Sequence, residues 1–380
     1  MKKLFIIFIM LCLLFYSATV FAEELFVPED IRVVIADSNE AFTLSIKSDY
    51  TVRTIETAEV LKEGKLSFDI SIKASAKGIC FGKDEFKIYG IEIVPKKEPA
   101  FYFGKRLYGG TLQIIRTKEG SLRVINIISL EDYLKGVLYK EISHRWPIEA
   151  IKAQAIACRT FALYQAQQNK GSYYYLKDDV SSQVYGGVFA QRFRTDKAVD
   201  MTRGKVLLYE GKFLPAFFHA TCAGATEDSS QLWKVSMPPL KGRSCLFCKK
   251  SPHYFWKADI KLSEIEKALK KSGHDVSGLR DIRVIARNKS GRVTKLNFFR
   301  GALVLSFSAK DLRHILGPSR IRSTRFNIKV VDGYAHFSGT GWGHGVGLCQ
   351  WGARGMAQQG RKAQEILAYY YPGSQIVKLD

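Results

Sequence analysis

Residues 130–162 read LEDYLKGVLYKEISHRWPIEAIKAQAIACRTFA. Apolar residues recur at helical spacing over residues 130–138, which predicts a short helix, and Ser129 stands at the position of its N-cap. Pro147 is predicted to begin a second helix, because the backbone N–H that proline lacks has no hydrogen-bond partner in the first turn of a helix. The second helix carries one apolar stripe that should face a core, formed by Ile148, Ile151, Ala155, Cys158 and Ala162. These patterns predict two helices with Glu141 in the loop between them.

The region before these helices is rich in predicted strands. Short runs of alternating apolar and polar residues are separated by Gly, Asp and Lys, which predicts antiparallel strands and a β-rich N-terminal domain over residues 23–128. The runs are Ile31–Ala36, Ala41–Ile46, Leu66–Ile72, Glu85–Val94, Gly110–Arg116 and Leu122–Ile128. This region carries no cluster of catalytic residue types, so we expect a folded support or a binding module.

Residues 129–380 mix helical and strand patterns, and we expect them to form one α+β catalytic unit. Helices are predicted at Ala198–Arg203, Leu262–Lys271 and Ala309–Leu316, with strands between them. A Cys-rich insert occupies about residues 219–256. Near the end, residues 339–355 contain seven glycines in seventeen residues, which predicts a glycine-rich loop. The predicted fold class is therefore α+β, with a β-rich N-terminal domain before a mixed α+β domain.

The first residues resemble a secretory leader. Lys2 and Lys3 precede an uninterrupted apolar run that ends in small residues at Ala22, so residues 1–22 are predicted to be a signal peptide. The run is shorter than the roughly 20 residues that span a membrane. We therefore expect an exported protein, in the periplasm or in the cell wall and outside the cell. A membrane contact is expected only if the leader is retained as an anchor.

The chain is strongly basic, with a formal net charge of +22. Such a balance fits nucleic acid, anionic lipid or another polyanion. A nucleic-acid protein would carry a basic motif interleaved with aromatic residues. Lys and Arg are instead spread along the whole chain, so we expect no nucleic-acid partner. For an exported protein, an anionic cell wall is the polyanion in the same compartment.

Glu141 is the sharpest candidate for chemistry. Its neighbours Ile142, Trp146 and Pro147 provide an apolar environment, which raises the pKa of a carboxyl group and lets it keep a proton to donate. Lys140, His144 and Arg145 would oppose that shift, and the sequence leaves the balance open. The glycine-rich loop adds Trp342, His344, Gln350 and Trp351, residue types that suit contacts with sugar rings and hydroxyl groups. The loop lacks the lysine and serine of a phosphate-binding loop, so nucleotide binding is disfavoured.

Three cysteines have the spacing of a metal site. Cys245 and Cys248 form a C-x2-C pair, and Cys222 precedes them. Three thiolates and one imidazole would complete the tetrahedron of a structural zinc, with His253 as the expected fourth ligand and His219 as the alternative. A disulfide between two of the three thiols is the other interpretation. In either case we expect no cofactor to be needed for catalysis.

Several long motifs resemble, in order, those of the stage II sporulation protein D family, also known as the amidase-enhancer or autolysin-modifier family. They are LEDYLKGVLYKEISHRWPIEAIKAQAIACRTFAL at 130–163, SSQVYGG at 181–187, FFHATCAGATE at 217–227 with LW downstream, GTGWGHGVGLCQWGARGMAQQG at 339–360 and ILAYYYPG at 366–373. The β-rich first hundred residues resemble the family's N-terminal region more loosely.

This resemblance implies a secreted lytic transglycosylase that cleaves peptidoglycan glycan strands, preferentially those without stem peptides. The catalytic glutamate of the family follows the pattern G-V-x-x-x-E, which Gly136–Glu141 matches. The resemblance also implies a groove lined by Gln183, Tyr185, His219, Trp342 and His344, with Arg159 and Gln350 as supporting contacts. The alternative is a non-catalytic wall-binding protein that activates a wall amidase.

Overall fold

The structure, a computed structural model, describes residues 24–97, 101–179 and 182–379. The predicted signal peptide at residues 1–22 lies outside these residues. Within them, no helix has both the length and the apolar character needed to cross a membrane. The chain forms a mixed α+β architecture, β-rich at the N-terminal end, which confirms the predicted fold class.

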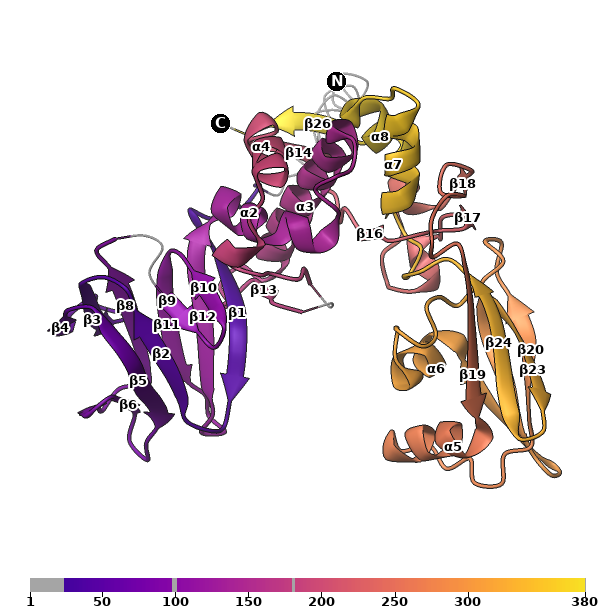
Figure 1. Cartoon of the computed structure of the whole chain (residues 1–380), viewed down its shortest axis with the longest axis horizontal. Helices are drawn as coiled ribbons and strands as arrows, with labels where there is room; N and C mark the ends of the chain where they lie inside the picture. Colours follow the sequence, from indigo (N-terminus) through magenta and orange to yellow (C-terminus); the bar gives the residue numbers. More distant parts are fainter. Residues whose placement is uncertain (1–23, 98–100, 180–181, 380) are drawn as a thin grey trace, which may run out of the picture.

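The N-terminal region consists of two sheets that share one core (Figure 1). In spatial order, the first sheet contains β13 (Leu176–Lys177), β1 (Asp30–Ser38), β12 (Leu122–Ser129), β11 (Thr111–Arg116), β8 (Gly90–Pro95), β3 (Tyr50–Thr54) and β4 (Val60–Gly64). The second contains β10 (Arg106–Tyr108), β9 (Phe101–Phe103), β2 (Phe42–Ile46), β5 (Ser67–Ala74), β6 (Ile79–Phe81) and β7 (Asp84–Phe86). Five of the six predicted runs each overlap one of these strands, and the sixth, Glu85–Val94, overlaps both β7 and β8.

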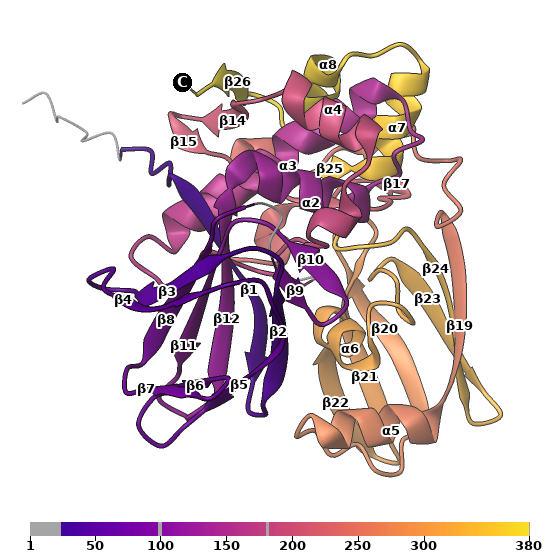
Figure 2. The same cartoon turned by 60° about the vertical axis from the view of Figure 1, so that its left-hand side comes forward.

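Two helices join this β region to the rest of the chain. They are α2 (Leu130–Glu141), capped by the Ser129 side chain as predicted, and α3 (Ile148–Gln168). The predicted stripe of α3 packs into the N-terminal core, while its opposite side enters a second core with Ala153, Ile156 and Ala157. Because α3 is buried on two sides, the two N-terminal sheets and the C-terminal part of the chain pack against the same helix (Figure 2). The core therefore continues across the expected domain boundary at residue 129.

The second core lies on the far side of α3 and is closed by elements from distant parts of the chain. Its helices are α7 (Gln350–Gln358) and α8 (Ala363–Tyr370), whereas α4 (Phe193–Met201) packs Ala198 and Val199 into the N-terminal core. Its strands are β14 (Lys205–Tyr209), β15 (Lys212–Phe213) and β26 (Gln375–Lys378) in one sheet, and the short pairs β16 (Phe218–His219) with β25 (Leu348–Cys349) and β17 (Gly224–Ala225) with β18 (Ser244–Cys245). The parallel β16–β25 pair aligns His219 with Cys349, although these two residues are 130 positions apart in the sequence.

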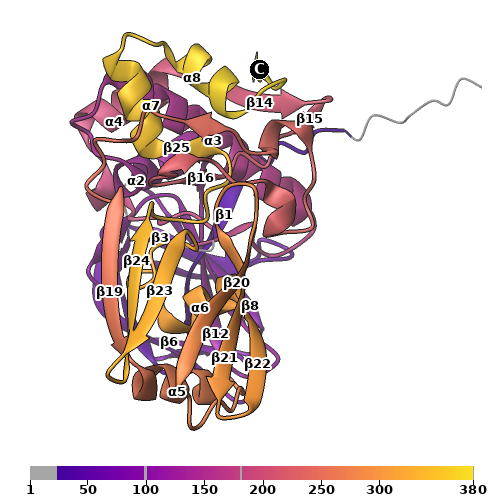
Figure 3. The same cartoon turned by 90° about the vertical axis from the view of Figure 1, so that its right-hand side faces the viewer.

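Residues 256–337 have a hydrophobic core of their own. Two three-stranded sheets and two helices surround it (Figure 3). The strands are β19 (Phe255–Lys261), β20 (Asp281–Arg287), β21 (Val293–Arg300), β22 (Leu303–Ser308), β23 (Phe326–Val331) and β24 (Tyr334–Thr340), and the helices are α5 (Leu262–Lys271) and α6 (Ala309–Leu316). Both helices have the bounds that the sequence predicts. The single C-terminal unit expected from the sequence is thus divided between two cores.

Candidate functional site

A cavity of about 650 Å³ opens beside the end of α2. It is formed where four separate segments meet: the end of α2 with the α2–α3 connection, the segment after β16, the segment between β18 and β19, and the glycine-rich region with the start of α7. Its lining residues are Tyr139, Lys140, Glu141, Ile142, Ser143, His144, Arg145, Trp146, Ala220, His253, Trp342, Gln350 and Trp351. Among these described residues, Glu141 is the only carboxylic acid.

Glu141 is the last residue of α2 rather than a loop residue, because the helix runs three residues beyond its predicted end. Its partial burial raises the pKa of its carboxyl group from 4.5 to about 7, since removal of water disfavours the charged form. A hydrogen bond from the Val184 N–H to Oε1, at 3.2 Å, acts in the opposite direction. The structure thus settles the balance that the sequence left open: desolvation dominates. Glu141 can hold a proton near neutral pH.

The predicted residues Gln183 and Tyr185 do not line this cavity; they hold the backbone that contacts Glu141. Both side chains are buried on either side of Val184. The Gln183 side chain accepts a hydrogen bond from the Tyr133 hydroxyl at 3.1 Å, and the Tyr185 hydroxyl donates to Asn126 Oδ1 at 2.9 Å. These bonds fix the segment so that the Val184 N–H points at the carboxyl group.

His219 and His344 also lie behind the cavity wall. His219 Nδ1 is 3.0 Å from the Val346 carbonyl oxygen, and His344 Nε2 is 2.8 Å from the Phe218 carbonyl oxygen. Burial lowers the pKa of His344 to about 4 and that of His219 well below its usual value, so both rings are neutral at neutral pH. Their hydrogen bonds join the glycine-rich segment to β16, which shapes the cavity without lining it.

Arg159 is not a groove residue either. Its side chain is fully buried and forms two hydrogen bonds to Glu131, Nε to Oε1 at 2.9 Å and Nη2 to Oε2 at 2.7 Å. It also donates to the carbonyl oxygens of Val199 and Lys205. The predicted supporting contact with substrate is therefore corrected: Arg159 ties α3 to α2, α4 and β14 inside the protein.

Trp342 and Gln350 line the cavity as predicted, and further aromatic rings accompany them. Trp146 and Trp351 lie edge to face, 5.2 Å between ring centroids, and Tyr139 lies close to Glu141 along α2. The sequence pointed to Trp351 as a residue suited to contacts with sugar rings and to Trp146 as part of the apolar environment of Glu141. It did not identify Tyr139, which lies two residues before Glu141.

Cationic side chains lie over three of these rings. Arg354 lies over Trp351 at 4.6 Å, Arg322 over Trp342 at 5.0 Å and Arg192 over Tyr139 at 4.5 Å, each measured to the ring centroid. Lys140 and Arg145 belong to the lining itself. The cavity therefore combines apolar ring faces with positive charge and a single protonatable acid.

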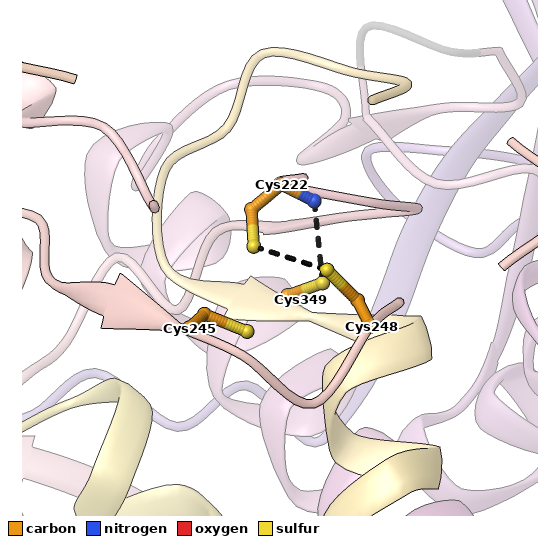
Figure 4. A group of neighbouring side chains, drawn as sticks. All are labelled: Cys222, Cys245, Cys248 and Cys349. Atoms are coloured by element: carbon orange, nitrogen blue, oxygen red, sulfur yellow. Dashed lines mark hydrogen bonds between the residues drawn. The ribbon is translucent and has the colours of Figure 1, made fainter. Parts of the chain in front are cut away.

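The four cysteines Cys222, Cys245, Cys248 and Cys349 form a buried group next to the cavity (Figure 4). Their sulfur atoms all lie within 4.8 Å of one another. The expected fourth member, His253, is not part of the group, because its ring faces the cavity and packs on Trp342 with 4.5 Å between centroids. The alternative, His219, is engaged by Val346. The structure corrects the fourth position to Cys349, which the β16–β25 pairing brings to Cys222.

Fold and site together define a mixed α+β protein with one protonatable carboxylic acid in an aromatic, basic cavity. A family model described as Stage II sporulation protein matches residues 118–209. A model of a domain of unknown function (DUF8618) matches residues 243–347, which include the separate hydrophobic core of residues 256–337. The stage II sporulation protein D of Bacillus amyloliquefaciens is 32% identical over 288 residues, covering 71% of this chain and 79% of that protein.

The chain belongs to the stage II sporulation protein D family, as its sequence motifs indicate. Two other relatives show the range of this similarity. An uncharacterized protein of Brachyspira hyodysenteriae is 31% identical over 348 residues, covering 91% of this chain and 92% of its own. The amidase enhancer of Bacillus subtilis is 27% identical over 286 residues, covering 63% of this chain and 40% of that protein.

Proposed function

We propose that this protein is an exported lytic transglycosylase that cleaves peptidoglycan glycan strands with Glu141 as its only acid and base. The observation that supports the proposal most strongly is the position of Glu141: a carboxyl group with a pKa of about 7 in a cavity walled by tryptophan and tyrosine rings. Aromatic faces suit the apolar faces of sugar rings. The protonated carboxyl group can donate to the glycosidic oxygen as the bond breaks.

One carboxyl group is enough for this reaction. After the proton has passed to the glycosidic oxygen, the Glu141 carboxylate takes the proton of the C6 hydroxyl on the same oxocarbenium-like sugar. That oxygen closes a 1,6-anhydro ring, and no water enters. A hydrolase would need a second carboxylate roughly 5–9 Å away.

Two other acids, Asp178 and Glu227, are engaged elsewhere in the described part of the chain. Asp178 pairs with Arg106, and its Oδ1 accepts a hydrogen bond from the Tyr185 N–H. Glu227 Oε2 accepts from Ser290 and Asn288 inside the protein. Neither lines the cavity, which favours the lytic reaction over hydrolysis.

The charge of the cavity fits strands without stem peptides. Removal of a stem peptide leaves a free lactyl carboxylate on each muramic acid, and Lys140 and Arg145 place positive charge in the lining. Opposite charges steer and retain such a polymer, and the attraction falls as salt rises.

Analysis of the reaction products tests the proposal. Purified protein incubated with peptide-free glycan strands should release fragments that end in 1,6-anhydromuramic acid, detected by mass spectrometry. New reducing ends without anhydro ends would instead show hydrolysis.

The second candidate function is that of a non-catalytic activator of a wall amidase, which the name of the amidase enhancer suggests. Stimulation of an amidase by protein that releases no glycan fragments would support that function and exclude ours.

The rate should fall at alkaline pH. Glu141 must be protonated to begin the reaction, and its pKa is about 7, so kcat/KM should be constant well below pH 7 and fall about tenfold per pH unit above it. The measurement is the initial rate on peptide-free strands between pH 5 and pH 9, at constant ionic strength. A rate that stays level from pH 6 to pH 9 would contradict the assignment of Glu141 as the acid.

A further inference from the structure

We propose that Cys222, Cys245, Cys248 and Cys349 bind one zinc ion as four thiolates. The site would be structural, closed to substrate, and would hold three walls of the cavity in place. It goes beyond the proposed function, because metal binding by these residues does not depend on what the cavity cleaves.

The spacing of the sulfur atoms fits a tetrahedral ion. Four sulfur atoms at about 2.3 Å from zinc lie about 3.8 Å from one another. The Cys222 and Cys248 sulfur atoms are 3.6 Å apart, and all four lie within 4.8 Å of one another. A disulfide would place two sulfur atoms about 2.05 Å apart. Figure 4 shows the four side chains converging on one point from three chain segments.

Hydrogen-bond donors surround the group in the way that thiolate ligands require. The backbone N–H groups of Cys222 and Gly352 both donate to the Cys349 sulfur at 3.3 Å. The Tyr370 hydroxyl lies 3.2 Å from the Cys245 sulfur. Such donors stabilise negative charge on sulfur and orient the ligands of a metal. The fully buried guanidinium group of Arg292 pairs with Glu227, with 3.6 Å between Nε and Oε2, and also interacts electrostatically with Cys222 and Cys349.

The ligands are close along the chain to cavity residues. Cys349 immediately precedes Gln350 and Trp351, Cys222 follows Ala220 by two residues, and Cys248 lies shortly before His253. One ion would therefore join the glycine-rich segment, the segment after β16 and the Cys245–Cys248 turn. Four sulfur ligands in a tetrahedron are typical of zinc or iron, and zinc is the choice for a closed site without redox chemistry.

Metal analysis of the purified mature chain tests the proposal. Elemental analysis should find about one zinc per chain in the wild type, less than a tenth of that in Cys349→Ser, and an unchanged amount in His253→Ala. Cys80→Ser is the matched control, because Cys80 is a half-buried thiol of β6 outside the group. Zinc that is kept in Cys349→Ser but lost in His253→Ala would overturn the four-cysteine site.

Two further measurements use only the wild type, in case a variant fails to fold. Replacement of the metal by cobalt(II) should give the intense sulfur-to-metal absorption of a four-thiolate site, and a chelator should increase hydrogen exchange over residues 339–351. A wild-type protein that contains no zinc and has two disulfides among these cysteines would refute the proposal, and iron in place of zinc would refute the choice of metal.

Discussion

Glu141→Gln should lower the rate of glycan cleavage by about 10²- to 10⁴-fold, the usual contribution of a general acid. Glutamine keeps the size of the side chain, and its carbonyl oxygen can still accept the hydrogen bond from the Val184 N–H. It cannot donate a proton to the glycosidic oxygen or take one from the C6 hydroxyl. The measurement is the initial rate of release of 1,6-anhydro fragments from peptide-free strands.

The control for this variant is Glu85→Gln, which removes an exposed carboxylate from β7 and should leave the rate unchanged. Stability gives a second check that Glu141→Gln is folded. The folded-state pKa of Glu141 lies above its value in the unfolded chain, so the wild type loses stability as pH rises from about 4.5 to about 7. Glutamine does not titrate. The variant should therefore match the wild type near pH 4.5 and exceed its free energy of unfolding by about 3 kcal/mol at pH 8. A folded variant that cleaves at the wild-type rate would exclude Glu141 as the acid.

The fold was predictable wherever local pattern decides it. The alternating runs before residue 129 became strands, and the apolar stripe of α3 became a core contact, because period and burial are coupled in both kinds of element. Two features depend on packing between distant segments. Helix α3 is buried on two sides, and its second buried side, around Ile156, is rich in alanine and less apparent as a stripe. The separate core of residues 256–337 follows from which strands pair, which local patterns do not encode.

The site shows the same division. Glu141 and its apolar neighbours lie within a few residues of one another, so the sequence could single out Glu141 as a candidate acid but not the sign of its pKa shift. Cys349 could not be found as the fourth thiol by spacing, because only the β16–β25 pairing brings it to Cys222. Gln183 was identified through its motif, but that motif supports Glu141 through the Val184 backbone N–H. A motif residue close to a site can thus act by fixing the chain beside it.

Glu131→Ala should lower the free energy of unfolding by about 3–5 kcal/mol, the cost of leaving a buried charge without its partner. Arg159 is 0% exposed in its side chain, and Glu131 supplies both acceptors for its Nε and Nη2 groups. The Val199 and Lys205 carbonyl oxygens that remain are neutral and do not offset the positive charge. Urea denaturation at pH 7, followed by circular dichroism, measures the change.

An exposed ion pair of the same residue types provides the control for Glu131→Ala. Arg320 and Glu264 lie 2.8 Å apart with about half of each side chain exposed, so Glu264→Ala should cost less than about 1 kcal/mol. An equal loss of unfolding free energy in the two variants would show that the buried pair contributes no more to stability than the exposed one.

Glu131→Ala also separates the structural role of Arg159 from the substrate contact that the sequence predicted. Arg159 lies away from the cavity, so Glu131→Ala should keep the wild-type KM when it is assayed well below its unfolding temperature. A raised KM in fully folded protein would instead indicate that Arg159 contacts the substrate.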